Sequence, residues 1–243
     1  MNLIKLDATA STNTYLRDLC NTCVLDNFTV VVAENQFAGK GQRGSQWSSE
    51  VGNNLTFSVF VKDFLPSAAF VFDLNILVVL SIYQALKNNF NLTFNIKWPN
   101  DILAENKKIG GILIENMLKA DGSVQSIIGV GLNVNQQNFE FLPQGSSLAK
   151  LCGEKVDKNA VLEFILEEMK QHLSVFSTEK MITYWQNYRL ALFRKDMVSA
   201  FEDTAGNRFS GIIRSVTELG MLQVELDDQE LKEFGLKEIK LLY

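Results

Sequence analysis

The stretch that decides the fold is residues 94–115, which read FNIKWPNDILAENKKIGGILIE. Phe94–Trp98 and Lys107–Glu115 are rich in apolar and β-branched residues and are predicted to be strands. Glu105-Asn106, between them, is a turn signal. The stretch therefore predicts two strands separated by a polar segment.

The polar segment carries side chains of the kind that form a site. Lys97-Trp98-Pro99-Asn100-Asp101 places a cation, an aromatic ring and a carboxylate at the end of a strand, where α/β folds usually form their sites. The following strand contains two consecutive glycines, Gly110 and Gly111. Glycine weakens a strand unless something must approach the backbone closely. We therefore expect a ligand to bind here.

Outside this stretch the pattern predicts an α/β (α+β) domain followed by a small β module. The expected strands are Ile4–Leu6, Val30–Ala33, Leu55–Val61 and Ser126–Val134, and the expected helices are residues 12–20, Pro66–Asn88, Lys158–Phe176 and Glu179–Leu190. From Asp196 onward the short β-type runs are Val198–Phe201, Phe209–Val216, Leu222–Leu226 and Ile239–Leu242. This spacing is typical of a small all-β barrel. We place the two domains at residues 1–193 and 194–243.

Composition and charge exclude several classes of protein. The chain has 243 residues, of which 47% are hydrophobic, and its 23 basic and 28 acidic residues give a net charge of −5. The bulk positive charge typical of nucleic-acid binding is missing. The N-terminal residues lack the pattern of a secretory signal, and the most apolar run, Leu74–Leu86, is too short to span a bilayer. We expect a soluble cytoplasmic protein with no nucleic-acid or membrane partner.

One histidine and three cysteines limit the chemistry further. His172 lies beside an apolar stripe with helical spacing, and we interpret it as a surface or boundary residue, not as a catalyst. A site with two histidine metal ligands is excluded. Cys20 and Cys23 have the spacing of a redox motif or half a metal site, but they fall late in a predicted helix without a second ligand pair. We interpret them as structural.

Gly39-Lys40-Gly41-Gln42-Arg43-Gly44 follows a predicted strand and matches the pattern G-x-G-x-x-G. A dinucleotide-binding loop would open a helix at the third glycine, but residues 45–54 have no helical periodicity, and a Walker A loop would have lysine where Ser45 stands. Inward-facing backbone amides and the charges of Lys40 and Arg43 still favour an anion. Trp47 could stack on a flat ligand. The alternative is an exposed, flexible hairpin loop.

A further glycine-rich strand, Gly129-Val130-Gly131-Leu132-Asn133, completes a set of motifs. The other members are Ser11-Thr12-Asn13, Gln36 with the loop Gly39–Trp47, Lys97–Asp101, and Lys108-Ile109-Gly110-Gly111-Ile112. In this order they make the sequence similar to the biotin protein ligases over nearly its whole length. The resemblance implies a mixed β-sheet catalytic domain, related to the class II synthetase-like biotin/lipoate ligases, followed by an SH3-like β-barrel.

The resemblance also implies an ATP-dependent reaction in two steps. The carboxylate of biotin attacks the α-phosphorus of ATP, accompanied by Mg²⁺, and forms biotinyl-5′-AMP and pyrophosphate. A lysine of a biotin carboxyl carrier protein or domain, part of a biotin-dependent carboxylase, then takes the biotinyl group and releases AMP. The first step brings an anion onto a polyanion, so the site must supply positive charge and exclude water.

Individual roles follow from the same resemblance. The implied catalytic residues are Lys108, Arg43, Lys97 and Asp101. The implied biotin-binding residues are Ser11, Thr12, Asn13, Gln36, Gly39, Lys40, Gly41, Gln42, Arg43, Lys108, Gly110 and Gly111, and the implied ATP-binding residues are Arg43, Trp47, Asn100, Lys108 and Asn133. No residue is assigned as a metal ligand. Asp101 would position Mg²⁺ or the incoming amine, or else simply cap the turn after Pro99.

Two positions depart from the family pattern, because Gln42 and Ser45 stand where relatives often carry arginines. Lys40 and Arg43 would then carry more of the phosphate neutralisation.

Some relatives also repress transcription through an N-terminal DNA-binding domain. Here the first motif begins at Ser11, so we expect a ligase without repressor function. A lipoate ligase and a protein that only stores the adenylate are the rival interpretations, and the chain could be a monomer or a homodimer.

Overall fold

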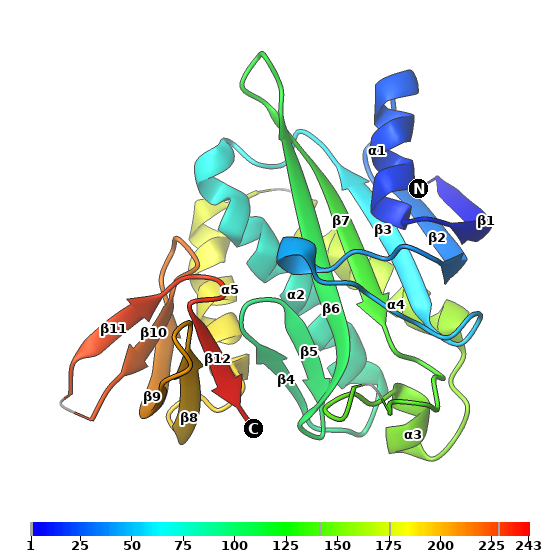
Figure 1. The fold of residues 1–243 in the computed structure, drawn as a ribbon. Helices are drawn as coiled ribbons and strands as arrows, with labels where there is room; N and C mark the ends of the chain where they lie inside the picture. Colours follow the sequence, from blue (N-terminus) through cyan, green and yellow to red (C-terminus); the bar gives the residue numbers. More distant parts are fainter. Residues whose placement is uncertain (1, 141, 175, 228) are drawn as a thin grey trace.

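Seven strands form a mixed sheet: β1 (Leu3–Thr9), β2 (Thr29–Gln36), β3 (Leu55–Val61), β4 (Phe94–Lys97), β5 (Asp101–Ala104), β6 (Lys107–Leu118) and β7 (Val124–Leu132). This computed structural model describes residues 2–140, 142–174, 176–227 and 229–243, but not the side chain of Arg43. The order of the strands in the sheet is β1-β2-β3-β7-β6-β5-β4. β1 and β2 are parallel, and the other neighbouring pairs are antiparallel (Figure 1).

Turn chemistry sets the two hairpins that carry β6. Glu105 and Asn106 have φ angles of 48° and 61°, and they connect β5 to β6, as the turn signal predicted. Gly122, with φ of 82°, lies in the turn between β6 and β7. The long β6–β7 hairpin then pairs Gly110 with Leu132 and Gly111 with Gly131, so two predicted glycine motifs become direct neighbours.

Three helices cover one face of this sheet: α2 (Val71–Asn89), which follows a 3₁₀ turn at Ala68–Phe70, α4 (Lys158–His172) and α5 (Thr178–Ala191). Figure 1 shows α2 and α4 behind the strands. Their apolar residues and the inward-facing residues of β3, β6 and β7 form the main core. Burial of this apolar area is the principal stabilising term for the domain.

Among the described residues, one helical segment, Ala68–Asn89, is long and apolar enough to cross a membrane. It extends beyond the apolar run Leu74–Leu86, which the sequence analysis took to be too short. In its most apolar window 56% of the segment is buried inside the protein, where it packs against α4 and α5. It is therefore a core helix of this domain.

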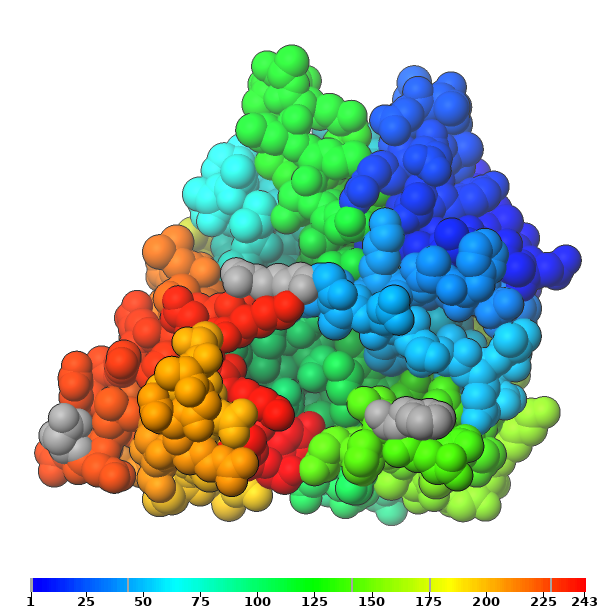
Figure 2. Space-filling view, viewed as in Figure 1, coloured from blue at the N-terminus to red at the C-terminus, as the bar shows by residue number. Residues whose placement is uncertain are grey.

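The opposite face of the sheet is covered only in part. Helix α1 (Thr12–Thr22) packs on β3 and β7 through a small cluster that contains Leu16, Phe60 and Ile127. Below α1, the segment 37–54 that joins β2 to β3 crosses this face, with its short helical turn η1 (Gln42–Gly44) in front of β6 (Figure 1). Figure 2 shows that the surface is hollowed between this segment and the red C-terminal part of the chain.

The C-terminal residues form a second, five-stranded antiparallel sheet. Its strands are β8 (Val198–Asp203), β9 (Arg208–Val216), β10 (Leu222–Glu225), β11 (Leu231–Phe234) and β12 (Ile239–Leu242), in the order β11-β10-β9-β8-β12. Its inward side, which includes Phe201, Ile213 and Leu222, joins the main apolar core. The fold class predicted from the sequence, a mixed-sheet α+β domain with a small β-barrel module, is confirmed.

Most predicted elements form within a few residues of their expected ends. Three further short elements, which the sequence analysis did not predict, are β5, β11 and helix α3 (Leu148–Cys152). Each has only four or five residues, too few for a hydrophobic period to be recognised. Helix α4 also ends at His172, four residues before the expected end at Phe176.

Candidate active site

A cavity of about 220 Å³ opens on the sheet face between α1 and the segment 37–54. It brings together twelve of the residues expected at the site: Ser11, Thr12, Asn13, Gln36, Lys40, Gly41, Gln42, Trp47, Asn100, Asp101, Lys108 and Gly111. Its floor is made of β6 and β7, through Ile112, Leu113, Gly129, Val130 and Gly131. Residues of all five motifs that the sequence analysis identified therefore share one cavity.

One end of the cavity is lined by buried hydroxyl and amide groups. The Oε1 atom of Gln36 accepts hydrogen bonds from the main-chain N–H of Thr12, at 2.7 Å, and from its hydroxyl, at 3.0 Å. Because this oxygen is occupied, the NH₂ of Gln36 is the group that can donate to a ligand. Ser11, at the N-cap of α1, makes no side-chain capping bond, and its hydroxyl has no other partner in the part of the chain that the structure describes, so it is also available.

Asn13 forms the rigid side wall of this end. Its Nδ2 donates to Glu115 Oε2 at 2.8 Å and to the Leu113 carbonyl at 3.3 Å. The Ser58 hydroxyl lies 2.6 Å from Asn13 Oδ1 and 2.7 Å from Thr12 Oγ1, within donating distance of both. All polar atoms of the Asn13 amide are thus used within the protein, which suits a residue that shapes the wall.

The other end of the cavity is charged. Asp101 Oδ1 lies 2.6 Å from Lys108 Nζ, and Asp101 Oδ2 lies 3.6 Å from Lys97 Nζ. These side chains are all partly buried, between 14% and 28% exposed, so their interaction is less screened than at an open surface. With one carboxylate between two ammonium groups, the cluster keeps one net positive charge. An anion placed beside it would be stabilised.

Trp47 forms the roof of the cavity, and Gly131 makes room for it. A Cβ atom on Gly131 would lie 2.4 to 2.8 Å from atoms of the indole ring, too close for any other residue. The ring nitrogen of Trp47 is buried without a hydrogen-bond partner among the described residues. A flat ligand with an acceptor at this position would complete its bonding.

A second cavity, of about 480 Å³, continues on the other side of Trp47. Trp47, Gln46 and Lys108 line both spaces, and Asn133 lies only in the second. Asn133 is buried, and its Nδ2 donates to the Ser146 carbonyl at 3.2 Å. Lys108 therefore stands where the two cavities meet, with hydroxyl and amide groups on one side and Asn133 on the other.

The glycine-rich segment forms a tight loop rather than a helix start, as expected. Gly41 N–H donates to the Ser45 carbonyl at 2.7 Å, and the Ser45 hydroxyl donates to the Gln42 carbonyl at 2.8 Å. Ser45 thus closes the turn. Lys40 Nζ donates to Thr14 Oγ1 at 3.0 Å and links the loop to α1. The expected roles of Arg43 depend on a side chain that lies outside the described part of the structure.

Four expected site residues do not line the first cavity: Gly39, Gly110, Lys97 and Asn133. Gly110 and Gly111 are consecutive in a strand, so they face opposite sides, and a Cβ atom on Gly110 would meet Leu132 at 2.9 Å. Gly39 is packed against the Trp47 carbonyl. Lys97 reaches the site through Asp101 while lining a different cavity.

The sequence analysis missed two polar residues of the site, Ser58 and Glu115. Ser58 is fully buried in the middle of the apolar strand β3, and Glu115 bonds Asn13 and forms an ion pair with Arg17 of α1. A lone serine in a run of buried apolar residues is a signal that could have pointed to Ser58. Nothing in the sequence distinguishes Glu115 from other strand-end carboxylates.

The described residues hold no group of three or more His, Cys, Asp or Glu side chains that could hold a metal ion. Among the residues that line the first cavity, Asp101 is the one carboxylate, and both of its oxygens face lysines. This donor set does not by itself hold Mg²⁺, which usually keeps several waters and binds through one or two carboxylates together with substrate phosphates. The ion therefore fits here only as a companion of bound ATP.

Comparisons with known proteins agree with this geometry. The model of the Biotin/lipoate A/B protein ligase family matches residues 6–133, over half of the chain. The bifunctional ligase/repressor BirA of Escherichia coli is 30% identical, over 89% of this chain and 67% of its own length. The biotin–[acetyl-CoA-carboxylase] ligase of Mycobacterium tuberculosis is 28% identical, over 81% and 73%.

Among solved structures, the biotin protein ligase from Aquifex aeolicus in complex with biotin and ATP has a TM-score of 0.81 to this chain. It is 24% identical, and the match covers 99% of this chain and 98% of that one. The likeness extends over both sheets, so the two proteins share the whole arrangement and not only the larger domain.

Proposed function

The chain belongs to the Biotin/lipoate A/B protein ligase family, and we propose that it forms biotinyl-5′-AMP from biotin and ATP and transfers the biotinyl group to a lysine of a biotin carboxyl carrier domain. The family and the ligase class expected from the motifs are confirmed. The observation that carries the proposal is the position of Lys108. It joins a cavity lined by hydroxyl and amide groups to a second cavity across Trp47.

Biotin suits the first cavity. Its ureido ring presents N–H donors and a carbonyl acceptor, which match the hydroxyls of Ser11 and Thr12 and the free NH₂ of Gln36. The dithiolane ring of lipoate has neither an N–H donor nor a carbonyl, so it would leave the Ser11 hydroxyl and the Gln36 NH₂ unpaired. An unpaired buried polar group costs about 1–3 kcal/mol, which favours biotin over lipoate.

In the first step the carboxylate oxygen of biotin forms a bond to the α-phosphorus of ATP, and the bond to pyrophosphate breaks. Both reactants are anionic, so their approach needs positive charge that is already in place. The Lys108 ammonium, at the junction of the cavities, would contact both the carboxylate and the phosphate. Asp101, bonded to Lys108 at 2.6 Å, would hold that ammonium in a fixed position.

Water must be kept from the mixed anhydride, which would otherwise hydrolyse. We assign this task to the segment 37–54, whose Trp47 roofs the cavity and whose Lys40 is tied to Thr14. ATP would occupy the second cavity, with its adenine near Asn133. Mg²⁺ would accompany ATP and neutralise its phosphates.

In the second step the neutral amine of the acceptor lysine attacks the carbonyl carbon of the adenylate, and the bond to AMP breaks. The amine loses a proton, and Asp101 is the carboxylate best placed to take or direct it.

We also propose a catalytic domain at 1–193, a second domain at 194–243, and no repressor function, in line with the net charge of −5. We propose, too, that the protein is a soluble, cytoplasmic ligase.

Acceptor labelling tests the transfer step. The protein is incubated with biotin, ATP, Mg²⁺ and a biotin carboxyl carrier domain, and the intact mass of the carrier is measured. Biotinylation that is abolished when the acceptor lysine of the carrier is changed to arginine supports the proposal. Formation of biotinyl-AMP without any labelled carrier would instead identify a protein that stores the adenylate.

A further inference from the structure

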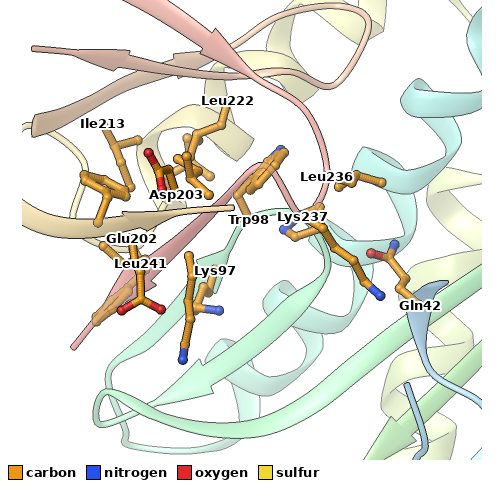
Figure 3. Close-up of a pocket in the computed structure, with 16 residues that line it drawn as sticks. Gln42, Lys97, Trp98, Glu202, Asp203, Ile213, Leu222, Leu236, Lys237 and Leu241 are labelled. Atoms are coloured by element: carbon orange, nitrogen blue, oxygen red, sulfur yellow. The ribbon is translucent and has the colours of Figure 1, made fainter. Parts of the chain in front are cut away.

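Two consecutive residues, Lys97 at the end of β4 and Trp98 directly after it, are held by the C-terminal part of the chain. The indole N–H of Trp98 donates to the Gly220 carbonyl, in the β9–β10 turn, at 3.0 Å. The Lys97 ammonium lies 5.5 Å from the centroid of the Tyr243 ring, and Tyr243 follows β12. Figure 3 shows Lys97 and Trp98 on the wall of a cavity of about 430 Å³ between the sheets, together with Leu241 of β12.

The Tyr243 ring is itself firmly placed. It makes an edge-to-face contact with the Phe193 ring, with the ring centroids 5.1 Å apart and the planes at 68°. Gln144 Nε2 donates to the main-chain oxygen of Tyr243 at 2.6 Å, while the Gln144 carbonyl accepts from the Lys108 N–H at 2.7 Å. Tyr243 is thus linked through its ring to Lys97 and through its backbone to the segment that borders Lys108.

The ring stays a neutral phenol under all ordinary conditions, because burial and the nearby charge of Asp101 raise the pKa of Tyr243 to about 12. Its face therefore attracts the ammonium through the ring quadrupole. On its other side Lys97 faces Asp101 at 3.6 Å. A flexible lysine side chain is thereby confined between a carboxylate and an aromatic face.

We propose that Tyr243 is a positioning residue for adenylate formation, whose ring face holds the Lys97 ammonium beside Asp101 at the edge of the cavity. The inference rests on the proposed function. Preorganised charge stabilises the developing phosphoryl charge without reorganisation, whereas a mobile lysine would have to be ordered during the reaction. The second sheet would then contribute to the chemistry through one aromatic ring.

Fluorination of the ring separates electrostatics from packing. Tyr243→Phe keeps the ring face, whereas Tyr243→pentafluorophenylalanine keeps the shape and reverses the quadrupole. We expect kcat for biotin-dependent pyrophosphate–ATP exchange to be retained in Tyr243→Phe and to fall about 3- to 10-fold in the fluorinated variant, the range of a partly desolvated cation–π contact. The KM for biotin should not change, because Tyr243 does not line the biotin cavity.

Tyr83 provides the matched control, because Lys87 lies 5.6 Å from the centroid of its ring, on helix α2 and away from the site. Tyr83→pentafluorophenylalanine should leave the exchange rate unchanged. Equal kcat values for Tyr243→Phe and Tyr243→pentafluorophenylalanine would overturn the inference. A wild-type protein without biotin-dependent exchange would instead overturn the proposed function, and the positioning role with it.

A readout without catalysis tests the contact itself. Lysines labelled with ¹³C-methyl groups are observed by NMR, and the Lys97 signal is identified by its loss in Lys97→Met. A ring face beneath the ammonium shifts this signal upfield. We expect the shift in the wild type and in Tyr243→Phe, and its loss in Tyr243→Leu. The same chemical shift of the Lys97 signal in all three proteins would contradict the contact, whatever the exchange assay shows.

Discussion

The Asp101 carboxylate forms an ion pair with the Lys108 ammonium across two paired strands, β5 and β6, with Asp101 Oδ1 2.6 Å from Lys108 Nζ. The register brings the two groups together, because Asp101 pairs directly with Gly111, and a Cβ atom on Gly111 would lie 3.5 Å from Asp101 Oδ1 and 3.8 Å from Lys108 Cε. The charged centre of the site is therefore produced by strand pairing. Lys97, four residues before Asp101, then approaches the same carboxylate from the other side.

Removal of the Lys108 ammonium should damage adenylate formation. We expect Lys108→Ala to lower biotin-dependent pyrophosphate–ATP exchange by about 100-fold or more, the cost of losing one preorganised charge contact. The neighbouring Lys107 points to the Pro143 carbonyl and not into the cavity, so Lys107→Ala serves as the control and should retain the wild-type rate. A loss of less than about threefold in Lys108→Ala would remove Lys108 from the reacting centre.

Ser58 should matter for biotin and less for ATP. Ser58→Ala removes the hydroxyl between Thr12 and Asn13, so the KM for biotin should rise about tenfold while the KM for ATP stays near its wild-type value. Ser126→Ala is the control, since Ser126 is also a buried strand serine but bonds Asn116. Both variants should lose about 1–2 kcal/mol of stability. An equal biotin KM in the two would place Ser58 outside the binding network.

Gly131 should be required for the position of Trp47. A methyl group at residue 131 would collide with the indole ring, so Gly131→Ala should displace the roof of the cavity and shift the fluorescence of Trp47 to longer wavelength. Trp47→Phe identifies the contribution of this tryptophan to the spectrum. Addition of ATP with biotin should change the wild-type spectrum and not that of Gly131→Ala. An unchanged spectrum in Gly131→Ala would show that Trp47 does not lie on this strand.

The single histidine should make stability depend on pH. Burial lowers the pKa of His172, only partly opposed by a hydrogen bond to the α2 backbone and by Glu168, and its Nδ1 lies 2.9 Å from the Ser81 hydroxyl. The unfolded chain binds a proton below about pH 6.5, while the folded chain resists it. Stability should therefore be fully present above about pH 6.5 and fall with acidification, by at most about 1.4 kcal/mol per pH unit.

Urea midpoints between pH 5 and 7.5 measure this dependence. Replacement of the titrating ring in His172→Gln should flatten the curve in this range, since no other histidine exists. A wild-type curve as flat as that of His172→Gln would contradict the lowered pKa.

Much of the site could be predicted because its residues lie within short motifs at strand ends. Lys97, Asp101 and Lys108 are close in the sequence, and a turn signal predicted that the chain reverses between them. Their meeting with Thr12 and Gln36, in contrast, depends on the strand order, which places β6 and β7 beside β3 and beneath α1. A strand order in which β7 separates β3 from β6 is not encoded in any local pattern.

The residues that were missed or misplaced have a common physical cause. Successive residues of a strand face opposite sides of the sheet, so the motif Gly110-Gly111 contributes one residue to the cavity and one to the packing against Leu132. Gly131 lies within a motif that was recognised, yet only the structure shows that Trp47 occupies its missing side chain's place. The contacts of Trp98 and Lys97 with the second sheet span more than 100 residues and leave no local signal.

The most direct test of the account is pyrophosphate–ATP exchange measured in Mg²⁺ buffer with biotin, with lipoate and with neither acid. The account predicts exchange with biotin alone, because the Ser11 hydroxyl and the Gln36 NH₂ match a ureido ring and the Lys108–Asp101 pair meets the carboxylate of biotin. Exchange with lipoate alone would keep the fold and contradict the substrate. Folded protein that shows no exchange with either acid would contradict the ligase reaction itself.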